Sequence, residues 1–431
     1  MMFKVLILAY YYPPMGLSGV QRTLKFTKYM PKFNWHPTVI TTGNAAYYAH
    51  DFSLLREAEE AGVKIIRTDS FDINSIIGKK FHTVNVPKEF LRKIYSYFSK
   101  ILFIPDNKKS WAKKSYAIAR ELLQKEKYDV LFVTCPPFSS FIYAANLKKE
   151  FNIPLIVDYR DLWYENHFSF YPTPYHKRKN KKLEYNSLKA ADRIIVINRR
   201  IKEKLLTDYP FLTYDEIIII PHGFDPEDFN INIDDLVKEK TKMRFTYSGL
   251  FYENNTPKYF LNAFKKLSIE RPDITANIEL EFVGLMRDEY IKLINDLKLN
   301  EFVKIYGYLE HKEAIKKIMS SDILWMMVGK NVKNVDTIST SKLYEYFGTR
   351  KPILGCVPNG AAKSALIEYG ASFITSPDDV DEIKEKIIEI HSLYSNNMLP
   401  KPNEEFVQRH NRILLTEQLI TQFQFSLKDL P

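Results

Sequence analysis

The sequence contains only two cysteines, Cys135 and Cys356, among 431 residues. Both lie in apolar stretches typical of strands, and their spacing fits neither a metal site nor a disulfide framework. Such scarcity suits a reducing compartment, so we expect a cytoplasmic protein. No pair of aspartates stands in an Asp-x-Asp pattern between strands that would hold Mg²⁺, so we expect neither a metal nor a cofactor.

Long hydrophobic runs are also missing. No stretch of about eighteen uncharged apolar residues occurs, so no membrane-spanning helix is expected. The apolar start, residues 1–10, lacks a small-residue cleavage site and continues into Tyr11-Tyr12-Pro13-Pro14. This pattern favours a buried first strand over a signal peptide.

Acidic residues are outnumbered, with 52 Asp and Glu against 62 Lys and Arg, which gives a formal net charge of +10. A positive balance is compatible with nucleic acid, an anionic membrane surface or phosphorylated substrates. The sequence has no nucleic-acid recognition motif, so no nucleic-acid partner is expected. Hydrophobic residues make up 45% of a chain too long for one typical domain, which predicts two or three domains with large cores.

Strand-like and helix-like stretches alternate along the chain. In the first half, strands are predicted at 4–9, 38–41, 63–67, 130–134, 154–157, 193–197 and 217–220, and helices at 20–30, 111–125, 141–149, 180–190 and 199–206. After a polar stretch at 226–242, strands are predicted at 244–248, 279–283, 303–306, 323–327 and 352–357, and helices at 258–267, 288–297, 312–320 and 342–347. Repeated β-α units with continuously apolar strands predict parallel, doubly wound sheets.

This alternation places the chain in the α/β class, with two Rossmann-like domains facing each other across a cleft that binds ligands. We expect an N-terminal domain over 1–228 and a C-terminal domain over 229–395. The remaining residues, 396–431, are expected to form a helical segment that returns to the first domain.

The segment 337–357 carries the most specific local pattern. Ser339, Thr340 or Ser341 is a candidate helix N-cap, Gly348 a candidate helix end, and an apolar strand follows. A helix N-terminus presents unpaired N–H groups that can bind a phosphate, and Glu345, one turn into the helix, could accept both hydroxyls of a ribose. The alternative is an ordinary capped helix before a buried strand.

Seven short segments, in this order and spacing, resemble the retaining glycosyltransferases of family 4 with the GT-B fold, in the branch acting in bacterial surface-polysaccharide synthesis. The segments are Tyr11–Arg22, Ile104–Asp106 with Trp111, Thr134–Ser139, Asp158–Trp163, Ile220–Asp225, Tyr247–Gly249 and Ser341–Glu345. The resemblance covers essentially the full length. It implies transfer of a sugar from a nucleotide diphosphate donor to a growing, lipid-linked glycan, with retention of configuration. It also implies that 1–228 is the acceptor-side domain and that 229–395 binds the nucleotide sugar.

The chain departs from the family pattern at three places. Of the two donor-site glutamates usual in the family, Glu345 matches the second, but Thr337 occupies the position of the first, beside Asp336. Of the Arg and Lys usual after the first strand of the second domain, only Lys258 remains. His222 stands where Asn is common.

Sugar transfer leaves negative charge on the departing diphosphate, so fixed positive groups lower the barrier. We expect Lys258 and Lys342, together with the helix N-terminus at Thr340 and Ser341, to serve this purpose, with Gly249 close to the donor. The alternative for each lysine is a solvated surface cation.

In the first domain, Arg160 and Asp161 follow the strand predicted at 154–157. Arg160 could bind a phosphate with two nitrogens. Asp161 could orient an acceptor hydroxyl or take its proton. The alternative is an Arg–Asp pair that braces a loop. Gly16 and Gly19 would let the first loop approach the donor closely, unless they only form a turn.

The segment 87–104 predicts an amphipathic helix in which Lys88, Arg92, Lys93 and Lys100 stand among aromatic and aliphatic residues. Such a helix suits an anionic membrane surface, and a cytoplasmic enzyme could bind the inner membrane face through it. The alternative is a helix packed on the core with a solvated charged side.

Two other classes of function stay open on this sequence. One is a non-catalytic GT-B-like subunit that binds sugar or a partner enzyme, suggested by Thr337 and by the missing cation. The other is a sugar-nucleotide epimerase or hydrolase on the same scaffold. The base and sugar of the donor, the acceptor, the linkage and the oligomeric state are open as well.

Overall fold

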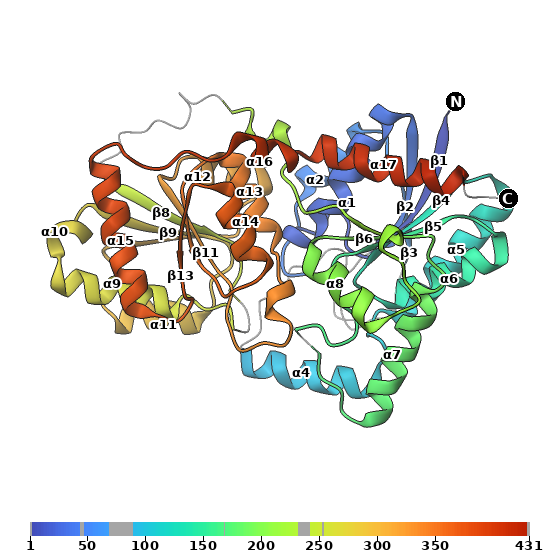
Figure 1. Cartoon of the computed structure of the whole chain (residues 1–431), viewed down its shortest axis with the longest axis horizontal. Helices are drawn as coiled ribbons and strands as arrows, with labels where there is room; N and C mark the ends of the chain where they lie inside the picture. Colours follow the sequence, from blue (N-terminus) through green and yellow to red (C-terminus); the bar gives the residue numbers. More distant parts are fainter. Residues whose placement is uncertain are drawn as a thin grey trace. The chain divides into compact units, whose positions relative to one another are not determined.

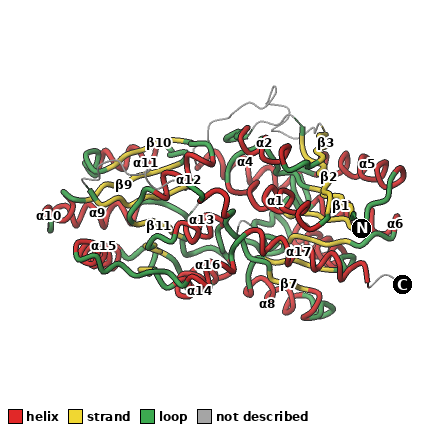
Figure 2. The backbone as a smooth tube through the Cα atoms, turned by 90° about the horizontal axis from the view of Figure 1, so that it is seen from above, coloured by secondary structure: helices red, strands yellow, loops and turns green. Residues whose placement is uncertain are grey.

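The computed structural model describes residues 2–43, 47–68, 89–167, 169–231, 242–251 and 254–428 (Figure 1). The chain divides into two compact units. The first unit comprises Met1–His222 and Arg412–Pro431, and the second unit comprises Gly223–Asn411. In both, helices flank a sheet of strands (Figure 2).

The described part of the first unit contains a seven-stranded sheet of order β3-β2-β1-β4-β5-β6-β7, with all neighbours parallel. Its strands are β1 (Phe3–Leu8), β2 (Trp35–Thr42), β3 (Lys64–Thr68), β4 (Val130–Cys135), β5 (Leu155–Tyr159), β6 (Arg193–Val196) and β7 (Ile217–Ile219). All six residues of β4 and all five of β5 are buried. Burial on both sheet faces explains why β4 and the first three residues of β5 are apolar.

Helices cover both faces of this sheet. The α-helices in the described part of this unit are α1 (Ser18–Tyr29), α2 (Phe52–Glu60), α4 (Glu89–Leu102), α5 (Lys109–Lys125), α6 (Ser139–Phe151), α7 (Pro174–Leu188), α8 (Arg199–Asp208) and α17 (Arg412–Lys428), of which α4 lies away from the sheet (Figure 1). Helix α17 lies along the sheet (Figure 1), and its Phe423 packs edge-on against Trp35 of β2 with ring centroids 5.1 Å apart. The last helix is therefore part of the first unit's core.

The described part of the second unit contains a six-stranded sheet of order β10-β9-β8-β11-β12-β13, also parallel. Its strands are β8 (Met243–Ser248), β9 (Ile278–Val283), β10 (Val303–Gly307), β11 (Ile323–Met327), β12 (Ile353–Cys356) and β13 (Ser372–Thr375). Its α-helices are α9 (Lys258–Glu270), α10 (Pro272–Thr275), α11 (Asp288–Asp296), α12 (His311–Met319), α13 (Ser341–Thr349), α14 (Ala361–Tyr369), α15 (Val380–Ser395) and α16 (Glu404–Arg409). One core lies under α9, α11 and α15, and another under α12, α13, α14 and α16.

Two parallel sheets, each covered by helices on both faces, confirm the predicted α/β class and the two Rossmann-like domains. The compact units divide at 222/223 and at 411/412, whereas the sequence suggested boundaries at 228/229 and 395/396. Within the polar stretch 226–242, a 3₁₀ turn spans Pro226–Phe229, and residues 232–241 lie outside the described part. No helix in the described part is both long enough and apolar enough to cross a bilayer.

Two local predictions were wrong. Gly348 does not end α13 but lies inside it, and the left-handed C-cap is Arg350, with φ 60°. The rings of Phe224 and Phe229 would lie within 2.8 Å of a Cβ atom at position 348, so glycine is required there for packing. The helix predicted from residue 20 begins earlier, at Ser18, so Gly19 lies inside α1 and not in the turn before it. The left-handed residue of that turn is Leu17, with φ 68°.

Candidate functional site

In the second unit, glycines follow strands at the carboxyl edge of the sheet. Gly249 follows β8 and Gly284 follows β9, with φ angles of 128° and 125°. The amide of Gly249 donates to the carbonyl of Val283 at 2.7 Å. A Cβ atom at Gly284 would stand only 2.7 Å from the carbonyl oxygen of Gly249. Because of this close packing and the positive φ angles, residues with a Cβ atom would be strained at both positions. The two glycines lie at the edge where such sheets bind ligands.

The structure brings Lys342 to Gly249. Lys342 Nζ would lie 2.7 Å from a Cβ atom at Gly249. The same ammonium donates to the hydroxyl of Tyr247 at 2.6 Å and lies 4.1 Å from that ring's centroid. A cation is thus fixed at the end of β8, as expected of a group that neutralises a leaving diphosphate.

The pKa of the Lys342 ammonium is lowered to near neutral pH. Burial lowers the pKa of its ammonium to about 7, against which the carboxylate of Glu345 raises it. A bound anion would favour the charged form and raise this pKa again.

The start of α13 lies next to this lysine in the sequence. Thr340 is the N-cap residue, but its side chain makes no capping bond. Its buried Oγ1 has no hydrogen-bond partner in the described part of the chain. Ser341 is the first helical residue. The neighbouring Ser339 hydroxyl instead bonds the hydroxyl of Tyr344 at 2.9 Å. No side chain therefore caps the first turn of α13, which suits an anion site, although the amide of Leu343 donates to the carbonyl of Thr340 at 3.2 Å.

Glu345 lies half-buried one turn into α13, and its charge acts on Lys342. The buried Thr337, at the position of the missing glutamate, donates its hydroxyl to the carbonyl of Asn334 at 2.8 Å. The adjacent Asp336 is half-buried, and no residue of the described part bonds its carboxylate. In the 3₁₀ turn Val335–Thr337, the carboxylate is therefore that of Asp336, one position before the place where the family usually has a glutamate.

In the described part of the chain, no contact joins Lys258 to Lys342, Gly249 or Glu345. It is exposed as the first residue of α9, and its Nζ lies 5.9 Å from the ring centroid of Tyr259. Its backbone amide donates to the hydroxyl of Thr256 at 3.3 Å. Of the two lysines predicted against the diphosphate, the structure fixes only Lys342.

In the first unit, the structure gives Arg160 a bracing position. Its guanidinium donates to the carbonyls of Gly19, Cys135 and Pro136 at 2.8, 3.3 and 3.3 Å. The buried side chain therefore joins the start of α1 to the end of β4, and its contact with a phosphate stays a prediction. The alternative, an Arg–Asp pair that braces a loop, is not formed either, since no ion pair joins Arg160 to Asp161 among the described residues.

Asp161 is half-buried just past β5 and has no hydrogen-bond or ion-pair partner in the described part of the chain. Asp158 behaves differently. It lies inside β5 rather than after it, and its carboxylate accepts from Arg22 Nε and Nη2 at 2.8–3.0 Å. Arg22 also bonds the carbonyls of Ile220 and Pro221. Asp158 therefore has a structural role, because its buried carboxylate pairs with Arg22.

The glycines of the first loop are held at its two ends. The amide of Gly16 donates to the carbonyl of Ala49 at 2.9 Å. Gly19 is the second residue of α1, and no heavy atom lies within 4 Å of a Cβ atom built on it. The space over Gly19 is therefore open, which a close approach by a ligand needs.

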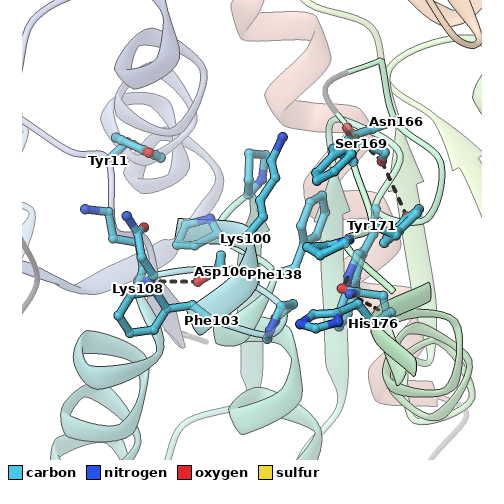
Figure 3. Close-up of a pocket in the computed structure, with 18 residues that line it drawn as sticks. Tyr11, Lys100, Phe103, Asp106, Lys108, Phe138, Asn166, Ser169, Tyr171 and His176 are labelled. Carbon is cyan, nitrogen blue, oxygen red and sulfur yellow. Dashed lines mark hydrogen bonds between the residues drawn. The ribbon is translucent and has the colours of Figure 1, made fainter. Parts of the chain in front are cut away.

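Sequence reasoning missed a pocket in the first unit (Figure 3). It has a volume of about 220 Å³ and lies where Tyr11, Phe138 and Trp163 follow strands β1, β4 and β5. The motifs 104–106, 134–139 and 158–163 all contribute lining residues, so their resemblance to a family could have pointed to a shared pocket.

Two families match the chain in succession. Residues 81–228 match the family described as Glycosyltransferase Family 4, and residues 228–405 match the one described as Glycosyl transferases group 1. No curated protein matches the sequence. The two domains in this order, on two Rossmann-like sheets, make the chain a glycosyltransferase with the GT-B fold.

Solved structures share this fold over the full length. A glycosyltransferase from Rickettsia africae superposes with a TM-score of 0.68 at 15% identity, covering 100% of both chains. HepE from Anabaena, in complex with UDP, gives 0.64 at 13% identity and covers 98% of this chain and 100% of its own. MnaA from S. aureus, with UDP, gives 0.56 at 12% identity, with 100% and 98% covered.

Proposed function

We propose that this glycosyltransferase moves a sugar from a nucleotide diphosphate donor to a lipid-linked glycan, with retention at the anomeric carbon. The observation that carries the donor part is the placement of Lys342 Nζ against Gly249 at the end of β8. A fixed cation, an uncapped helix start and the carboxylate of Glu345 supply the diphosphate and ribose contacts that such a donor needs.

The test of donor use is a thermal-shift screen with UDP-, GDP- and CMP-sugars, because a ligand that binds the folded state raises the apparent melting temperature. UDP-sugars come first, since HepE and MnaA share the fold and hold UDP. Release of nucleotide is then measured with and without glycan acceptors. Acceptor-dependent release supports transfer, and the anomeric configuration of the product reports retention.

The same assay separates the alternatives. A sugar-nucleotide hydrolase releases nucleotide equally with and without acceptor, and an epimerase changes the sugar. A non-catalytic subunit binds donor without turnover. Any of these results would contradict the proposed transfer.

Glu345→Gln should weaken donor binding. The amide keeps the shape of the side chain but accepts ribose hydroxyls less well than a carboxylate does. Hydrogen bonds to a charged group contribute about 1.5–3 kcal/mol, so we expect a loss of about tenfold or more in calorimetric affinity. Glu368→Gln, on the exposed side of α14, is the matched control. Equal affinity in both variants would remove Glu345 from the donor site.

A lipid-linked acceptor requires contact with a membrane, and α4 offers a surface for it. Tyr97, Phe98 and Leu102 are exposed, Leu102 by 72%. Lys100 lies among them on α4. Lys88 and the side chains of Arg92 and Lys93 lie outside the described part. Aromatic and basic residues on one helix support peripheral binding to an anionic inner membrane face.

Replacing Lys88, Arg92, Lys93 and Lys100 by Gln should release the protein from anionic vesicles. Each cation near such a surface contributes about 1 kcal/mol, which salt screens. Flotation with anionic and neutral vesicles at low and high salt measures the effect, and donor binding should stay normal. Equal binding to both lipids, or to neither, would leave α4 as ordinary packing.

A further inference from the structure

Glu184 of α7 is a carboxylate buried in the first unit without a cation beside it. The residue is 1% exposed, and no ion pair reaches it within the part of the chain that the structure describes. A buried carboxylate loses most of its hydration, so its charged form depends on the hydrogen bonds that it accepts. The partners of Glu184 therefore decide what this residue does.

Three donors from three segments converge on this carboxylate. The hydroxyl of Tyr159, the last residue of β5, donates to Oε1 of Glu184. The hydroxyl of Tyr209, just after α8, and the amide of Tyr164 donate to Oε2 at 2.6 and 3.0 Å. All three groups donate, which is the arrangement that suits an ionised carboxylate.

The loop that follows β5 is anchored to Glu184 at its far end. The amide of Tyr164 bonds the carboxylate directly, and the amide of Trp163 donates at 2.6 Å to the Tyr159 hydroxyl, which bonds the carboxylate. The indole of Trp163 is fixed to the same helix, since its Nε1 donates to Asn180 Oδ1 at 3.0 Å. The end of the loop is therefore attached to α7 through its backbone as well as through a side chain.

The start of the same loop is anchored to β4. The amide of Arg160 donates to the carbonyl of Cys135 at 3.2 Å. Asp161 and Leu162 alone separate this anchor from the one at Trp163. The backbone that carries the Asp161 carboxylate is thus held on both sides, and one of the two anchors depends on α7.

We propose that Glu184 is a positioning residue, whose ionised carboxylate holds this loop in the conformation that presents Asp161 to an acceptor hydroxyl. The task of Asp161 rests on the proposed function, whereas the attachment of the loop to Glu184 does not. Protonation of Glu184 would replace charge-assisted hydrogen bonds by weaker neutral ones, and the new O–H would meet groups that are themselves donors. The loop is then held less firmly.

The surroundings of Glu184 bring this protonation close to neutral pH. The titratable side chains around the carboxylate come from β5, the loop after it, the segment before α7 and the end of α8, and they are Tyr159, Tyr164, Tyr171, Asp208 and Tyr209. Burial raises the pKa of the Glu184 carboxyl to about 7, and the charge of Asp208 acts in the same direction, against the lowering by the three hydrogen bonds. Asp208 is itself paired with Lys204 at 3.0 Å. Glu184 therefore changes from charged to neutral as the pH falls through about 7.

The pH profile of sugar transfer at saturating donor tests the proposal. In the wild type, kcat should fall as the pH drops below about 7, because the loop loses an anchor. Glu184→Gln replaces an acceptor oxygen by a donor nitrogen, so it cannot hold all three donors at any pH. Its kcat should be lower by about tenfold to a hundredfold at pH 8, since a displacement of about 1 Å can cost about a hundredfold in rate. Glu121→Gln, exposed on α5, is the matched control and should keep the wild-type profile.

Tyr209→Phe separates the titration of Glu184 from that of Asp161. The Tyr209 hydroxyl bonds Glu184 from the side of α8 and not from the loop. Its loss should raise the pKa of Glu184, so the acidic limb should move upward by about one pH unit while the plateau of kcat stays unchanged. Tyr159→Phe removes the link to the Trp163 amide and should lower the plateau itself. An acidic limb at the same pH in Tyr209→Phe and the wild type would overturn the role of Glu184.

Hydrogen exchange, measured by mass spectrometry, reports the loop without any reaction. The peptide 160–166 should exchange faster in Glu184→Gln than in the wild type at pH 8, and the peptide 130–135 of β4 should exchange equally in both. If no sugar is transferred but the loop responds in this way, the anchor stands and the proposed function is wrong. If sugar is transferred and Glu184→Gln melts earlier with an unchanged kcat per folded molecule, Glu184 only braces the fold and the positioning role is wrong.

Discussion

Replacing Lys342 by methionine should lower donor affinity by about tenfold to a hundredfold and slow transfer further. The ammonium is fixed by the Tyr247 hydroxyl at 2.6 Å, against the open backbone of Gly249. Hydrogen bonds to charged groups contribute about 1.5–3 kcal/mol, which is the loss expected in the ground state. The charge on the diphosphate grows as the sugar leaves, so the same cation matters more in the transition state.

The pH dependence of donor binding distinguishes Lys342 from other cations. With a pKa of about 7 in the free protein, the ammonium loses its proton as the pH rises above 7. Donor affinity should then be constant below about pH 7 and fall above it, because binding must take up a proton. The methionine variant should lack this slope, and Lys312→Met, on the exposed side of α12, should keep it.

The stability of the variant provides the control for unfolding. The pKa of Lys342 is lowered in the folded state, so between about pH 7 and pH 10 the unfolded chain binds more protons than the folded one. This group's contribution to stability therefore rises with pH in that window, and it is least favourable below pH 7. The methionine variant should be at least as stable as the wild type at pH 6. A large fall in its melting temperature there would mean that Lys342 is structural.

The sequence predicted the fold well where local chemistry decides it. Strands such as β1 and β4 are continuous apolar runs because both sheet faces are covered, and this pattern needs no tertiary knowledge. Strand β5 was predicted to end before Asp158, because a carboxylate seldom lies inside a buried strand. It continues because Arg22, 136 residues away, pairs with that carboxylate. No local pattern announces such a partner.

For the candidate site as well, the sequence predicted local placement but not the contacts between distant residues. The spacing of Ser341, Lys342 and Glu345 placed three groups at one helix start, and α13 begins there. The contact of Lys342 with Tyr247, 95 residues apart, could not be read from periodicity. Arg160 was expected at a ligand because it follows a strand, but backbone carbonyls claim its guanidinium. These carbonyls belong to residues 24 to 141 positions away in the sequence, so no local pattern could predict them.

Asp161→Asn should reduce the rate of transfer by about a hundredfold or more while leaving donor affinity unchanged. Asp161 follows β5 at the carboxyl edge of the first sheet, and no residue in the described part of the chain bonds its carboxylate. A carboxylate in that position can take the proton of an acceptor hydroxyl or orient it. General-base contributions of this kind are about 10²–10⁴-fold. Asparagine keeps the size of the side chain but cannot take the proton.

The kinetic pattern decides between catalysis and bracing for Asp161. Loss of an interaction made only in the transition state lowers kcat and kcat/KM equally, with the donor Kd constant. Because the carboxylate has no partner in the described residues, the melting temperature should stay within the range of a surface control, Asp215→Asn. If the variant instead melts earlier and its turnover per folded molecule is unchanged, Asp161 braces the loop. The catalytic carboxylate would then have to be sought elsewhere.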